Sequence, residues 1–113
     1  MERNGIEGPF PLTDTSIDEQ VTDTSPGVFT LDDDDTVRFH VVFVGRSDRD
    51  VNNQLHVYVG KYKRFKFAYC LSAQTAFEKE CELFHDFDPR DNVNHPARPG
   101  DSGWKCRRCA LFG

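Results

Sequence analysis

A glutamate stands where the sequence predicts an apolar surface. Between residues 72 and 87, apolar side chains recur at the three-and-four spacing of one face of an α-helix: Ala73, Ala76, Phe77, Leu83, Phe84 and Phe87. Glu80 lies in the middle of that face. A carboxylate directed at a core is unfavourable unless it is paired. Glu80 therefore either reaches an Arg or a backbone N–H at the edge of the core, or it is a metal or substrate ligand in a cleft.

A second set of residues has the spacing of a zinc site. Cys106 and Cys109 form a C-x-x-C turn, which brings two thiolates within reach of one ion, but a tetrahedral site needs two further ligands. We expect His85 and His95 to complete the site. Cys81 is a substitute ligand, because it lies one helical turn before His85. Such a site would be structural and would fix an irregular tail. The alternative is a pair of free thiols in a frayed terminus.

Positive charge gathers in one segment of this acidic chain, between residues 60 and 66. Four basic side chains are interleaved there with aromatic ones: Lys61, Lys63, Arg64 and Lys66. These side chains could follow a phosphate backbone while the neighbouring rings stack on bases. The alternative is an exposed edge strand that its lysines protect from pairing.

Arg46 and Arg49 directly follow the most hydrophobic segment of the chain. Loops at strand ends commonly carry function, and two guanidinium groups there could hold phosphate. Together with Glu80, these arginines are the candidate catalytic residues. The alternative is a surface loop with hydrated charges.

Five elements must position these side chains. β-Branched and aromatic residues predict strands at residues 27–31, 37–44 and 64–70, and the second is expected at the centre of the sheet because it is the most hydrophobic. Ser72 is expected to cap the helix that carries Glu80. Asp48 is expected to cap an earlier helix that ends at Gly60. This order predicts an α+β fold with a small antiparallel three-stranded sheet flanked by helices.

The chain of 113 residues has room for one core. Residues 1–26 are polar and are expected to form an N-terminal arm, anchored at residues 10–12 and with a short helical turn near residues 17–21. Residues 27–94 are the predicted folded domain. Residues 95–113 are predicted to be an irregular C-terminal loop that carries the C-x-x-C turn and packs on the same domain.

The charge composition indicates the kind of organism in which the protein occurs. The chain has 19 acidic and 14 basic residues and a net charge of -5, and Asp outnumbers Glu. This bias is typical of halophilic archaea, whose proteins stay soluble through hydrated carboxylates. The alternative is ordinary acidity in one loop, residues 32–35. In a salty cell the attraction from counterion release is weak, so a negative net charge argues less strongly against a nucleic-acid partner.

The sequence shows no targeting or membrane segment. No apolar run is long enough to cross a bilayer, and the N-terminus lacks a basic-then-apolar signal, so we expect a soluble, cytoplasmic protein. In that setting, four cysteines indicate thiols or metal ligands rather than disulfides.

Several short motifs, in order along the chain, resemble those of the GIY-YIG superfamily. The first triplet is Gly27-Val28-Phe29, and the second is Phe43-Val44-Gly45, followed by Arg46-Ser47. Glu80 stands at the position of the superfamily's metal-binding carboxylate, three residues before the pair Leu83-Phe84. Asn94 resembles the Asn that often follows. The similarity covers residues 27–94.

The resemblance implies a nuclease-like domain. Members mostly cut phosphodiesters with one divalent metal, usually Mg²⁺; the tyrosines of the triplets help handle the attacking water, an Arg stabilises phosphate charge, and the Glu holds the metal. In this sequence Phe29 and Phe43 replace the tyrosines and lack their hydroxyls. Gln54, which precedes Leu55, replaces the Arg.

These departures favour a domain with a degraded catalytic motif that binds nucleic acid or a nucleoprotein partner through residues 61–66 and the loop arginines. The alternative is an active, divergent endonuclease that holds Mg²⁺ with Glu80 and uses Arg46 or Arg49 in place of the missing Arg. A third interpretation is a zinc-stabilised protein-interaction module.

Overall fold

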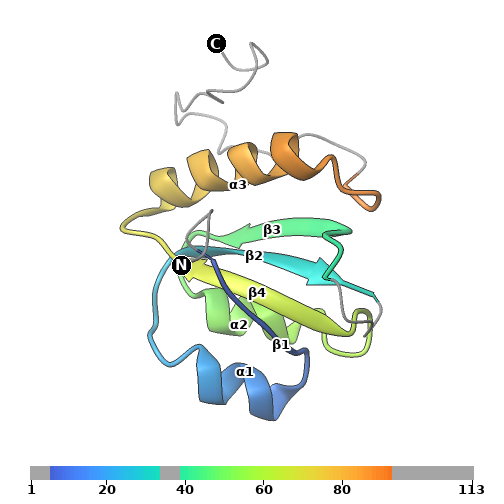
Figure 1. The fold of residues 1–113 in the computed structure, drawn as a ribbon. Coiled ribbons are helices and arrows are strands. Elements are labelled where there is room, and N and C mark those ends of the chain that lie inside the picture. Colours follow the sequence, from blue (N-terminus) through green and yellow to red (C-terminus); the bar gives the residue numbers. More distant parts are fainter. Residues whose placement is uncertain (1–5, 34–38, 93–113) are drawn as a thin grey trace.

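The computed structural model describes residues 6–33 and 39–92. These residues form four strands and three helices, shown in Figure 1, in the order β1 (Glu7–Pro11), α1 (Asp14–Gln20), β2 (Gly27–Asp32), β3 (Phe43–Ser47), α2 (Val51–His56), β4 (Arg64–Tyr69) and α3 (Ala73–Phe87). The α+β fold is therefore confirmed. None of the helices in this part of the chain is long and apolar enough to cross a membrane.

The sheet has the strand order β1-β4-β2-β3, and every neighbouring pair is antiparallel. The prediction of three strands was wrong, because β1 pairs with β4 and adds a fourth. The sequence did not indicate this strand because it contains Pro9 and Pro11, and proline cannot donate a hydrogen bond to a neighbouring strand. Proline is tolerated here because β1 lies at the edge of the sheet. The segment expected to be a polar arm thus contains both β1 and α1.

The second predicted strand differs from the observed one in extent and position. β3 covers Phe43–Ser47 rather than residues 37–44, and it lies at the edge of the sheet rather than at its centre. Its hydrophobicity has another cause: α2 and α3 both contact β3, from opposite faces of the sheet. A strand covered on both faces is apolar whether it is central or not.

Two apolar cores lie on the two faces of the sheet, with α1 and α2 on one face and α3 on the other (Figure 1). Side chains alternate between the two cores along β2, since Phe29 and Leu31 join the first and Val28 joins the second. All six residues of β2 are buried. This strand is therefore the centre of the molecule.

The helix predicted to carry Glu80 is confirmed. The Ser72 side chain accepts a hydrogen bond from the backbone N–H of Thr75 (3.1 Å) and caps α3, which ends at Asp88 in a left-handed conformation. Glu80 lies on the buried face and is 7% exposed. Phe87, placed on the same face by its spacing, is 40% exposed at the end of the helix.

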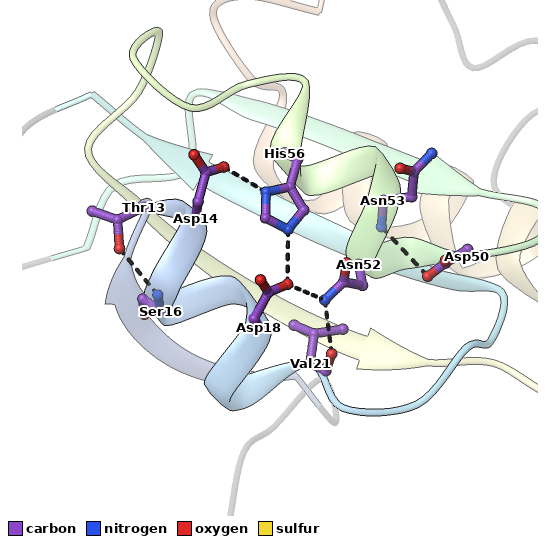
Figure 2. Close-up of polar contacts among 9 residues, drawn as sticks. All are labelled: Thr13, Asp14, Ser16, Asp18, Val21, Asp50, Asn52, Asn53 and His56. Atoms are coloured by element: carbon purple, nitrogen blue, oxygen red, sulfur yellow. Dashed lines mark hydrogen bonds and ion pairs between the residues drawn. The ribbon is translucent and has the colours of Figure 1, made fainter.

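Capping side chains also start the two shorter helices (Figure 2). Thr13 Oγ1 accepts a hydrogen bond from the N–H of Ser16 (3.1 Å), and Asp50 Oδ1 accepts one from the N–H of Asn53 (3.4 Å). The cap of α2 is therefore Asp50, and not Asp48 as the sequence suggested. The helix also ends at His56, before the predicted end at Gly60.

A polar cluster joins α1 to α2 (Figure 2). The two ring nitrogens of His56 lie 2.5 Å from Asp14 Oδ1 and 3.0 Å from Asp18 Oδ1. Asn52 donates hydrogen bonds to Asp18 Oδ1 (3.1 Å) and to the carbonyl of Val21 (2.9 Å). The hydrogen bond with Asp14 raises the pKa of His56, and the hydrogen bond from Asn52 lowers the pKa of Asp18. Both pKa shifts favour the charged forms, so the contact between His56 and Asp18 is most stable when the imidazole is protonated and Asp18 is ionised.

Candidate functional site

A cleft of about 390 Å³ opens beside β3. β3 is an edge strand with α2 on one face of the sheet and α3 on the other (Figure 1), and the residues that line the cleft come from all three elements. We call it the β3-edge cleft. It is lined by Phe43, Gly45, Arg46, Asp48, Gln54, Tyr58 and Glu80.

An ion pair forms one wall of this cleft. Arg46 Nη1 donates a hydrogen bond to Glu80 Oε1 (2.6 Å), and Arg46 Nε donates one to Asp48 Oδ1 (2.8 Å). The guanidinium also lies 5.2 Å from the centre of the Phe77 ring. Glu80 is thus paired with an Arg, as the first interpretation of the sequence required, and its carboxylate faces a cleft, as the second required.

The charge of Arg46 is fixed by its surroundings. Burial alone would lower the pKa of Arg46, but hydrogen bonds with Asp48 and Glu80 outweigh burial and raise the pKa. Arg46 therefore stays protonated and is shared by two carboxyl groups. In the cleft, the acidic groups outnumber the basic group two to one.

The resemblance implies Mg²⁺ at Glu80, and the residues here do not fit that ion. Both nearby carboxyl groups, on Glu80 and Asp48, bind the guanidinium of Arg46, which would repel a divalent cation. Within residues 6–33 and 39–92, no group of three or more His, Cys, Asp or Glu side chains could hold a metal ion.

Phe43 and Tyr58 line the cleft on the side of α2, and together with the neighbouring Tyr62 we call them the aromatic cluster. The ring centre of Phe43 lies 5.2 Å from that of Tyr58 and 6.0 Å from that of Tyr62. All three side chains are half-buried, so each keeps some exposed ring surface. Tyr62 donates a hydrogen bond to Asp91 (2.9 Å), and burial, together with this bond, raises the pKa of Tyr62 to about 12.

A glycine forms the floor of the cleft between these walls. Gly45 pairs with Phe29 across β2 and β3, and a Cβ atom at Gly45 would clash with the Phe29 ring. Phe29 is fully buried beneath the cleft, and its ring centre lies 5.6 Å from that of Tyr58. The residues that replace the triplet tyrosines, Phe29 and Phe43, are thus packed against other rings and present no hydroxyl to the cleft.

Gln54 stands where the superfamily has an Arg, and it does line the cleft. It lies one helical turn before Tyr58, and so both residues line the cleft from the same side. In the part of the chain that the structure describes, the side-chain amide of Gln54 has no hydrogen-bond partner. Its donor and acceptor are available to a ligand.

The side chain of Asn92 covers the outer edge of β3 at Val44. Asn92 Oδ1 accepts a hydrogen bond from the N–H of Val44 (2.7 Å), and Asn92 Nδ2 donates one to the carbonyl of Val44 (3.0 Å). The N–H of Asp91 donates to the carbonyl of Val42 (2.9 Å). Sequence reasoning missed Asn92 and selected Asn94, which lies outside the described residues. The cleft opens along the same strand at the residues that follow Val44, which are Gly45 and Arg46.

The structure separates the four basic side chains predicted to bind nucleic acid. Arg64 donates a hydrogen bond to the buried Asp32 (2.6 Å), and both Arg64 and Lys66 lie over the Phe39 ring. Lys61 and Lys63 are exposed, and Lys61 Nζ lies 6.0 Å from the ring centre of Tyr58, next to the cleft. Lys61 thus adjoins the aromatic cluster at Tyr58, and Lys63 lines a neighbouring pocket together with Lys61 and Tyr62.

The alternative interpretation, in which these lysines protect an exposed edge strand from pairing, was wrong. β4 pairs with β1 on one side and with β2 on the other, so it is an inner strand. Of the two arginines expected in the loop after the strand, Arg46 lies within β3 and lines the cleft. Arg49 does follow the strand, is exposed, and its N–H donates a hydrogen bond to Ser47 Oγ (3.2 Å).

The predicted zinc ligands fall into two groups. Cys81 is buried and His85 is partly buried, one turn apart on α3, as the sequence indicated. His95, Cys106 and Cys109 lie outside the described residues. The zinc site therefore stays a prediction.

Two further residues of the cleft, Asp48 and Tyr58, were not selected from the sequence as site residues, and Asp48 was expected to cap a helix. The signal that could have identified Asp48 is its place two residues after Arg46, where a carboxylate can return to the guanidinium.

The two triplets lie side by side in β2 and β3, and Glu80 faces the cleft at their edge. In comparisons with known proteins, no family model, curated protein or solved structure matches this chain.

Proposed function

We propose that this chain is a GIY-YIG-like domain with a degraded catalytic motif, which binds nucleic acid at the β3-edge cleft without cutting it. The observation that carries the proposal is the ion pair between Arg46 and Glu80 in the wall of the cleft (2.6 Å). The residue that the resemblance assigns to the metal is already bound to an internal cation.

Three further features support the loss of catalysis. The tyrosine positions are Phe29 and Phe43, and the Arg position is Gln54. Loss of one preorganised charge donor commonly lowers the rate on the order of a hundredfold or more. Losing that donor, both hydroxyls and the free carboxylate together leaves the cleft without the groups that phosphodiester hydrolysis requires.

Other features support binding. The aromatic cluster offers partly exposed rings, and Lys61 adds an exposed positive charge beside Tyr58. Aromatic rings combined with basic side chains are the usual means by which proteins bind nucleic-acid strands. The partner is either the nucleic acid alone or a nucleoprotein complex that presents it.

One observation favours a second function, an active divergent endonuclease. The Glu80 carboxylate does face an open cleft, and Arg46 is beside it as a charge donor. For this function a metal ion would have to displace Arg46 from Glu80.

The test compares binding with cleavage in the same samples. The protein is incubated with supercoiled plasmid and with structured RNA in Mg²⁺ or Mn²⁺ at molar KCl, and binding to labelled nucleic acid is followed by fluorescence anisotropy over a range of KCl concentrations. We expect saturable binding and intact nucleic acid. Cleavage that is lost in Glu80→Ala and kept in Glu82→Ala, an exposed position of the same helix, would establish the endonuclease instead. Absence of binding at every salt concentration would favour the protein-interaction module.

A further inference from the structure

We infer that the β3-edge cleft takes an unpaired nucleobase of a single strand, while the phosphates stay outside it. This inference rests on the proposed nucleic-acid binding and names the part of the ligand that enters the cleft. The proposed function alone does not distinguish a base from a phosphate group.

The charges of the cleft favour a base over a phosphate. Arg46 is the basic group that lines it, and its hydrogen bonds go to the carboxyl groups of Glu80 and Asp48. A phosphate oxygen that approached Arg46 would have to compete with both of these acidic groups and would be repelled by them. A nucleobase is neutral and meets no such repulsion.

The shape of the cleft also fits a flat ring. Phe43, Gln54 and Tyr58 line the cleft on the side of α2, the Arg46–Glu80 pair lines it on the side of α3, and Gly45 leaves bare backbone between them at the strand edge. Any larger residue at the floor would clash with Phe29. The volume of about 390 Å³ lies within the range of small-ligand pockets. A base can therefore stack on the aromatic wall.

Gln54 supplies the polar contact that such a ring would need. Its amide carries a donor and an acceptor side by side, and neither has a partner among the residues that the structure describes. A glutamine amide of this kind can make two hydrogen bonds to the edge of one base. The base must be unpaired, because pairing and stacking in a duplex would keep its face and its edge from this wall.

The backbone of the same strand has a separate place. Lys61 is exposed, and its ammonium lies over the Tyr58 ring, 6.0 Å from the ring centre. A base stacked on Tyr58 would bring its own phosphate toward Lys61 rather than toward Glu80. The cleft would thus hold the base of a nucleotide, and Lys61 at its rim would contact the phosphate of the same nucleotide.

The experiment measures anisotropy with three labelled probes: a short single-stranded DNA, the same strand with abasic sites in place of its bases, and its duplex. We expect the intact single strand to bind at least several-fold more tightly than the other two. Tyr58→Ala should weaken binding of the intact strand by about 5- to 100-fold and leave the abasic strand unchanged. Gln54→Ala tests the same cleft at a half-exposed residue, so it remains informative if Tyr58→Ala fails to fold.

Val57→Ala is the matched control, because Val57 directly follows the end of α2, lies between Gln54 and Tyr58 in the sequence, and is 53% exposed. Circular dichroism confirms that each variant is folded. If the intact and abasic strands bind equally and neither cleft variant changes binding, the inference is wrong and nucleic-acid binding stands. If none of the three probes binds, the proposed function is wrong as well.

Discussion

The ion pair between Arg46 and Glu80 makes a quantitative prediction about stability. Both side chains are largely buried, with exposed fractions of 13% and 10%. Two unit charges about 4 Å apart attract by about 4 kcal/mol at an effective dielectric constant of about 20. Dehydration of both groups offsets much of this attraction, and a hydrogen bond to a charged group typically contributes about 1.5–3 kcal/mol net. We therefore expect a coupling free energy of about 1.5–3 kcal/mol.

A double-mutant cycle measures this coupling. The variants are Arg46→Met, Glu80→Gln and the double variant, and the free energy of unfolding is obtained from urea titrations followed by circular dichroism. Arg46→Met should be the more destabilising single change, because Arg46 in Glu80→Gln keeps its bond to Asp48. In the double variant, the loss should be clearly smaller than the sum of the two single losses.

The exposed pair of Arg90 and Asp33 is the control for this cycle. Its N–O distance is 2.5 Å, but the exposed fractions of the side chains are 61% and 39%, so water screens the pair. The same cycle there should give no measurable coupling. If the losses at Arg46 and Glu80 also add within about 0.5 kcal/mol, the two side chains do not hold each other, and the reasoning about the cleft fails.

Three other predictions concern the framework of the cleft. Asn92→Ala should lower the free energy of unfolding by about 1–3 kcal/mol, because the backbone groups of the buried Val44 lose their partners, and Asn92→Asp should restore only the acceptor; urea titrations measure both. Gly45→Ala should destabilise by about 1–3 kcal/mol through its clash with the Phe29 ring, and an unchanged melting temperature would contradict this. His56 has a raised pKa, so its contribution is complete below its ordinary value of 6.5 and is lost as the pH rises through the folded pKa. His56→Gln should therefore remove a fall in melting temperature between about pH 6 and 8, and an equal fall in both proteins would show that the histidine is not its cause.

Local patterns in the sequence were sufficient for the parts of the fold that local patterns control. The helical spacing around Glu80 and the alternation of Phe65 and Phe67 gave α3 and β4 with nearly correct ends. These elements each bury one well-defined face, and so their periodicity is strong.

The position of strands in the sheet depends on distant contacts and was not predicted. β1 contains two prolines, and only its place at the edge makes them tolerable. β3 is apolar because helices cover both of its faces, which sequence cannot distinguish from a central position.

The candidate site was predicted in part. Glu80 and Arg46 were both selected from the sequence, but their contact joins residues 34 positions apart and was not predicted. Asn92 was missed because its role depends on where β3 ends. The contributions of Asp48 and Tyr58 to the cleft became visible only when α2, β3 and α3 were placed around one edge.

One titration tests the central claim most directly. Labelled single-stranded DNA is titrated with the protein in Mg²⁺ until the anisotropy reaches its plateau, and the same samples are then run on a denaturing gel. We predict a saturable rise in anisotropy and a strand of full length in every lane. A flat titration, or shortened strands that disappear when Glu80 is replaced by Ala, would contradict the account.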